Sequence, residues 1–320
     1  MVKGKTSYKP IDLSKLKTYS IKDRKNLVSV RQFATFAPPI KGFGKFINSL
    51  PKVLAATSFN KVVEAIVKAR KRDRPVVIAL GGHVVKCGLS PVIVDLMERG
   101  IVTALAMNSA AAIHDYEISL IGETSEDVSC SIKDGSFGMV KETAEAFRVA
   151  SALGVSDNIG LGRALGNKIL HDKNKFKQFS LLANGAKLNI PTTVHVAIGA
   201  DTIDMHPNVS GKDRGESSLI DFKILTSVVA NLEGGVWINM GSAVIMPEVF
   251  LKAITIARNL GNKVENFVTV NMDMIQHYRT QTNVIKRPTS LGYAITGHHE
   301  LMLPLLRMAI LSAMNAEKTK

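Results

Sequence analysis

The chain has 320 residues, of which 46% are hydrophobic and 21% charged, a composition typical of a globular protein with a full hydrophobic core. The formal net charge is +14, but residues 1–52 alone hold 12 Lys and Arg against 2 Asp and Glu. A basic nucleic-acid groove across the folded body is therefore not indicated, and nucleic acid is not an expected partner. Without a long apolar run or a secretory signal, we expect no membrane association and a cytoplasmic location.

The first 52 residues differ from the rest of the chain. They combine scattered Lys residues with the Pro38-Pro39 pair and show little periodicity, which predicts a basic extension packed on the body. Its charge would either be solvated or contact an acidic partner. The two cysteines, Cys87 and Cys130, match no metal-ligand spacing, so no metal site is expected. Residues 53–320 are predicted to form a single α/β domain.

From residue 53 onward, helical periodicity alternates with short apolar runs. Apolar residues at helical spacing predict a first helix at 53–71, which Pro75 would stop. Continuous apolar runs predict buried strands at 75–80, 101–108, 189–199, 234–240 and 266–272. Amphipathic segments predict further helices at 92–98, 216–231, 247–260 and 300–314. The alternation predicts a doubly wound, Rossmann-like α/β fold with a mostly parallel sheet and helices on both faces.

Small or polar residues follow every predicted strand. The carboxyl ends of parallel strands meet at one edge, where ligands bind. Small residues there would let a dinucleotide lie against backbone amides, with its pyrophosphate at helix N-termini. Alternatively, they only let helices pack closely. The G-x-G-x-x-G motif of ordinary dinucleotide-binding dehydrogenases is absent after the first strand.

Two parts of the chain resemble deoxyhypusine synthase. The segments VVIALGGHVVKCGLSPVI and LAMNSAAAIHDYEI match that family's strand, small-residue loop and helix, and WINMGSAVIMPEVFLKA, VTVNMD and TGHHELMLPLL continue the likeness. It covers residues 55–315 at the level of element order. The resemblance implies an NAD-binding fold and an NAD-dependent transferase. In that chemistry NAD takes hydride from the polyamine spermidine, and a lysine imine carries the aminobutyl group to an amine acceptor, a lysine of a translation factor. The resemblance also implies a homotetramer.

Strand ends and resemblance together predict the site. The expected cofactor residues are Gly81, Gly82, Asn108, Ser109, Ala110, Asp201, Gly241, Ser242, Asn271, Met272, Asp273 and His298. His114 and Asp115 stand where the family has paired acids beside the amine, although Asp115 is alternatively a helix N-cap. Gln276 and His277 are expected on the substrate side. Lys286, one position from the family's catalytic lysine, is the candidate for imine formation, or else a surface lysine.

One stretch departs from the family. Residues 245–248 read IMPE where the family has basic and histidine side chains facing the amine. The substrate is therefore open. Three functions remain: the aminobutyl transferase, a related NAD-dependent enzyme with another amine substrate such as homospermidine synthase, and a non-catalytic nucleotide-binding protein.

Overall fold

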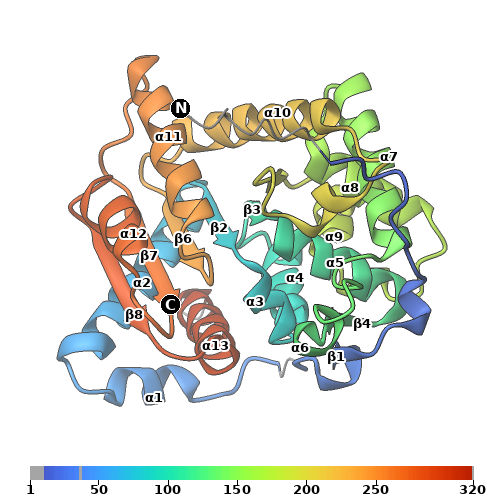
Figure 1. Ribbon diagram of the computed structural model, residues 1–320. Helices are drawn as coiled ribbons and strands as arrows, with labels where there is room; N and C mark the ends of the chain where they lie inside the picture. The colour runs from blue at the N-terminus through green and yellow to red at the C-terminus, as the bar shows by residue number, and fades with distance from the viewer. Residues whose placement is uncertain (1–10, 36–37, 319–320) are drawn as a thin grey trace, which may run out of the picture.

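The computed structural model describes residues 11–35 and 38–318 (Figure 1). Six parallel strands form a central sheet in the order β5-β3-β2-β6-β7-β8. In chain order this is the 3-2-1-4-5-6 arrangement of doubly wound folds, with the strand order reversing between β2 and β6. The strands are β2 (Val76–Leu80), β3 (Ala104–Asn108), β5 (Thr192–His195), β6 (Val236–Met240), β7 (Val268–Asp273) and β8 (Gly292–Thr296).

Helices cover both faces of this sheet. Val76, Ile78 and Leu80 of β2 enter one core, whereas Val77 and Ala79 enter the other. Alternate side chains of a strand point to opposite faces, so a strand covered on both sides is apolar along most of its length. The predicted fold class is confirmed.

Each core has its own helices. The first contains residues of α2 (Leu54–Lys71), α4 (Ser90–Glu98), α5 (Ser109–Ile121), α7 (Lys141–Ser156), α8 (Gly160–His171), α9 (Leu181–Lys187) and α13 (His299–Lys318). The second contains residues of α10 (Gly211–Ala230) and α11 (Ile245–Asn259). The shorter helices are α1 (Phe43–Ser49), α3 (Gly82–Lys86), α6 (Val128–Ser131), α12 (Tyr278–Thr280), the 3-10 turns η1 (Ile21–Asp23), η2 (Val30–Gln32), η3 (Lys177–Phe179) and η4 (Thr202–Met205), and the π-helical η5 (Gln281–Lys286). In the described ranges no helix has the length and apolarity needed to cross a bilayer.

The N-terminal extension joins the body through a second, two-stranded sheet. β1 (Asn26–Ser29) pairs antiparallel with β4 (Glu123–Glu126), and Tyr19 forms a backbone bridge to Val140. In Figure 1 the extension runs down the right of the view and along its base toward α1. Its strand β1 therefore lies beside β4, which directly follows α5.

The predicted elements are found with shifted ends, and one strand of the main sheet was missed. β8 is an edge strand in which only Ile295 is buried, so it lacks the continuous apolar run that marks the central strands. The sheet therefore has six strands where the sequence predicts five. The short helix α3 was likewise not predicted.

Candidate functional site

Strand register brings the predicted cofactor positions together. Leu80 pairs with Met107 and Met240, and Met240 pairs with Met272, so four strands end in one row. The residues that follow lie along one edge of the sheet, on both sides of the strand reversal: Gly81, Asn108, Gly241 and Asp273. Ligands of doubly wound proteins bind in this position.

The glycines after β2 allow close packing. Gly81 donates its amide hydrogen to Met240 O over 3.0 Å, and a Cβ at Gly81 would lie 2.1 Å from Gly241 O. A Cβ at Gly82 would lie 3.0 Å from the His114 ring. The Gly81 amide is therefore already bonded within the sheet edge, and the close-packing explanation accounts for both residues.

We expect Gly81→Ala to destabilise the protein by about 1–3 kcal/mol, because the new methyl group meets backbone that cannot turn away. Urea unfolding followed by circular dichroism measures the change. Gly215→Ala is the matched control, since that glycine lies in α10 with nothing within 4 Å of the new Cβ. Equal unfolding midpoints for both variants would contradict the close contact between β2 and β6.

At the start of α5, Asn108 caps the helix by accepting the Ala111 amide over 3.0 Å. Ser109 is buried, whereas Ala110 is exposed. Asp201 accepts the Ala197 amide over 3.0 Å and pairs with Arg214 over 2.9 Å, so it fixes the turn before η4. Burial raises the pKa of Asp201, although the Ser109 hydroxyl, the Ala197 amide and the Arg214 charge oppose this.

Polar side chains at the ends of β6 and β7 bind one another. Asn271 accepts a hydrogen bond from Asn239 and donates one to Gln276, both over 2.7 Å. Ser242 Oγ accepts the Met246 amide at the start of α11. Asp273 accepts the Met274 amide, and the buried Met272 accepts the His299 ring NH through its carbonyl oxygen. Gln276 therefore extends the chain of hydrogen bonds that joins the ends of β6 and β7.

The same edge exposes large apolar side chains on the loops and helix starts that follow four strands. They are between 51% and 71% exposed: Ile198, Val244, Ile275, Tyr278 and Leu301. Neighbouring apolar groups left open to water often mark a surface that a ligand or partner covers. We call these five residues the apolar rim.

A cavity of about 260 Å³, lined by apolar and charged side chains, lies beside the N-terminal half of α5. Its lining comes from the extension, α3, α5, β4, α7 and the turn at η4, and it includes two positions predicted for the cofactor, Ala110 and Asp201. Its charged and polar lining residues include Arg24, Lys86, His114, Glu117, Glu126 and Thr143.

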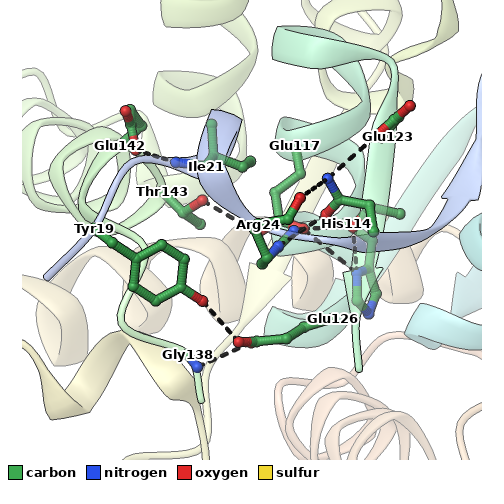
Figure 2. A network of polar contacts seen from close by, with 12 residues as sticks. Tyr19, Ile21, Arg24, His114, Glu117, Glu123, Glu126, Gly138, Glu142 and Thr143 are labelled. Carbon is green, nitrogen blue, oxygen red and sulfur yellow. Dashed lines mark hydrogen bonds and ion pairs between the residues drawn. The ribbon is translucent and has the colours of Figure 1, made fainter. Parts of the chain in front are cut away.

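Glu117 is the centre of a buried hydrogen-bond network (Figure 2). Arg24 of the extension pairs with it over 2.7 Å, and the two side chains are only 7% and 3% exposed. Thr124 and Thr143 also donate their hydroxyl hydrogens to this carboxylate, over 2.5 and 3.2 Å. Burial lowers the pKa of Arg24, but the hydrogen bond and charge of Glu117 raise it more, with a smaller contribution from Glu126. The negative charge of Glu117 is therefore balanced by Arg24 and stabilised by two hydroxyl donors.

The network fixes the tautomer of His114. Thr124 gives its only hydroxyl proton to Glu117, so His114 Nδ1, 2.8 Å from Thr124 Oγ1, must be the donor in their hydrogen bond. Nε2 is then unprotonated. Burial, followed by the charges of Lys86 and Arg24, lowers the pKa of His114 to about 3. The cavity therefore contains a neutral imidazole with an accepting Nε2.

Glu126 has a different environment from Glu117. It accepts hydrogen bonds from the Tyr19 hydroxyl over 2.7 Å and from the Gly138 amide over 3.0 Å. Burial and this carboxylate raise the pKa of Tyr19. Within residues 11–35 and 38–318 no cation forms an ion pair with Glu126. The negative charge of Glu126 is therefore stabilised by uncharged hydrogen-bond donors.

Asp115 lies away from the cavity, contrary to the expectation of a substrate contact. It is fully buried in the middle of α5, where its carboxylate accepts the Ser180 hydroxyl over 2.5 Å and the Leu181 amide over 2.6 Å. These donors belong to the N-terminus of α9. Burial raises the pKa of Asp115 to about 6, against the effect of these hydrogen bonds. The residue caps a neighbouring helix instead of its own.

Three other predicted residues are exposed. Lys286 ends η5, His277 precedes α12, and the His298 side chain is 62% exposed beside Glu300. None of them lines the cavity beside α5. In the described part of the chain, no three His, Cys, Asp or Glu side chains are arranged to hold a metal ion.

Sequence reasoning missed four lining residues: Arg24, Lys86, Glu117 and Glu126. Only Glu117 had a local signal, because residues three apart on a helix share a face and His114 precedes it by three positions. Arg24 lies 93 positions from its partner Glu117, and no local pattern indicates such a pair.

Comparison with solved structures shows a shared fold. Unliganded AgrE matches with a TM-score of 0.54 and 15% identity, over 80% of this chain and 33% of the AgrE chain. AgrE in a ternary complex with ornithine and NAD+ matches with a TM-score of 0.51 and 14% identity, over 88% and 35% of the two chains. This chain thus spans about a third of the length of AgrE.

A candidate deoxyhypusine synthase from Entamoeba histolytica matches with 13% identity over 88% of this chain and 98% of its own, but its TM-score of 0.46 is too low to bear on fold or function. No protein-family model matches the sequence, and no curated protein matches it. At these identities the likeness to AgrE extends to the fold alone.

Proposed function

We propose that the protein is an NAD-dependent enzyme that acts on a small amine held in the cavity beside α5. The observation that carries the proposal is Glu126, a carboxylate without a paired cation in the described part of the chain, in a cavity at the carboxyl edge of a doubly wound sheet. An ammonium group there would gain a charge-assisted hydrogen bond, worth about 1.5–3 kcal/mol.

The carboxyl edge has features that fit NAD. Gly241 has φ +62°, a backbone conformation that favours glycine, in the turn between β6 and α11. The N-termini of α5 and α11 lie at the same edge and favour a pyrophosphate, and the apolar rim offers surface for the rings. Bound NAD would supply a hydride acceptor. AgrE, which shares the fold, has been solved with NAD+.

The cavity residues would prepare the amine. Glu126 would hold the ammonium form, and His114 Nε2, the accepting nitrogen, would accept a further hydrogen bond from the same group and so orient the carbon that gives up the hydride. The ammonium proton would leave to solvent before the hydride departs. Thr124 and Glu117 keep the imidazole in that tautomer and orientation. The arrangement therefore supports binding and orientation of the amine.

Aminobutyl transfer from spermidine through a lysine imine is a narrower hypothesis. We expect Lys286→Ala to change the rate of amine-dependent NAD reduction less than twofold, because the side chain is exposed and lies outside the cavity lining. A Schiff-base lysine needs desolvation or a cationic neighbour, and Lys286 has only the adjacent Arg287. Loss of activity in this variant would instead support a lysine imine at Lys286 and a reaction like that of deoxyhypusine synthase.

The proposal is tested by titrating the purified protein with NAD in a calorimeter and then following NADH absorbance while diamines, polyamines and amino acids are added. We expect NAD binding and turnover with at least one amine. NAD binding without turnover would favour a non-catalytic nucleotide-binding protein. No binding at millimolar NAD would remove the proposal.

A further inference from the structure

We propose that the substrate is a zwitterion, a small amine that also carries a carboxylate or similar anionic group, with Glu126 at the ammonium end and Lys86 at the anionic end. This inference rests on the proposed function for the role of the cavity. It also narrows it, because a polyamine carries no anionic group.

The cations and acids of the cavity do not all pair with one another. Arg24 pairs with Glu117, and Asp201 pairs with Arg214 of α10. After these two pairs, one acid and one cation on the lining have no ion pair among the described residues: Glu126 and Lys86.

Lys86 is a half-buried cation at the end of α3. It lines the cavity together with His114 and Glu126. Removing part of its hydration shell without a counter-ion is unfavourable. An anionic ligand group in the cavity would relieve that cost.

A polyamine does not match this distribution of charge. One of its ammonium groups could bind Glu126, but the next would meet Lys86 and Arg24, whose partner Glu117 is already saturated by three donors. Like charges confined in a partly buried cavity repel more strongly than they do in water. A carboxylate in place of the second ammonium turns this repulsion into attraction.

Three ligands with the same four-carbon chain test the inference: 4-aminobutanoate, 1,4-diaminobutane and butanoate. Calorimetry on the NAD-saturated protein should show 4-aminobutanoate binding at least about 10-fold more tightly than either of the others, as one extra charge-assisted hydrogen bond predicts. Lys86→Met should remove most of its advantage over the diamine, and Lys86→Arg should restore it. Glu126→Gln should weaken both amines. Lys61→Met, on an exposed position of α2, is the control and should leave all three affinities unchanged.

The outcomes separate this inference from the proposed function. Tighter binding of 1,4-diaminobutane than of 4-aminobutanoate would overturn the zwitterion while leaving an NAD-dependent amine enzyme. An unchanged preference in Lys86→Met, with circular dichroism like that of the parent, would also overturn it. Failure to bind NAD removes the proposed function, and the three ligands are then compared on the protein alone.

Discussion

Replacing Arg24 with Met is expected to lower the free energy of unfolding by about 3–5 kcal/mol, because it leaves the Glu117 carboxylate buried without its cation. The two side chains are 7% and 3% exposed, so water cannot take the place of the guanidinium group. The same change would release the extension from α5. Urea unfolding at neutral pH measures the loss.

Two further variants show whether the loss comes from the unpaired charge. Arg24→Met combined with Glu117→Gln should recover much of the stability, since neither member then leaves a buried charge. Arg148→Met removes an exposed pair with Glu145, in which the side chains are 41% and 55% exposed, and should change stability by less than about 1 kcal/mol. If Arg24→Met is no more destabilising than Arg148→Met, the burial of the Arg24 pair is contradicted.

Replacing His114 with Phe is expected to lower kcat/KM by about 10–100-fold, because the ring volume is kept while the hydrogen-bond acceptor that orients the amine is lost. Amine-dependent formation of NADH measures the change. His171→Gln, at an exposed position ending α8, is the control and should leave kcat/KM unchanged. Equal activity of the parent and the Phe variant would show that His114 does not orient the amine.

Thr124→Val tests the positioning of His114 separately. It removes the hydroxyl that links His114 to Glu117, so the imidazole can exchange tautomers. We expect a smaller loss of kcat/KM than in His114→Phe and an altered pH profile, because the groups that fix the Nε2 acceptor are gone. A change in thermal stability alone, with an unaltered pH profile, would indicate a structural role for Thr124.

Much of the fold could be predicted because central strands buried on both faces are mostly apolar along their length. Val76 to Leu80 is such a run, and the helix that precedes it was predicted to within one residue at its start. β8 was missed because an edge strand with one buried residue has no such pattern. The local sequence pattern predicts individual helices and strands, but packing between distant elements determines the rest of the fold.

The candidate site, too, could be predicted from the sequence only in part. Parallel topology was enough to predict that Gly81, Asn108 and Gly241 share one edge. It could not predict that Asp115 caps α9, since its donors lie 65 to 67 positions along the chain. Nor could it predict that the extension forms a wall of the cavity, because Arg24 comes from outside the predicted domain.

A crystal structure of the protein soaked with NAD tests the central claim most directly. We predict that the pyrophosphate lies against the N-termini of α5 and α11, and that the nicotinamide faces the cavity lined by Glu126 and His114. NAD bound elsewhere on the surface, or a carboxyl edge that stays empty at saturating NAD, would contradict this account.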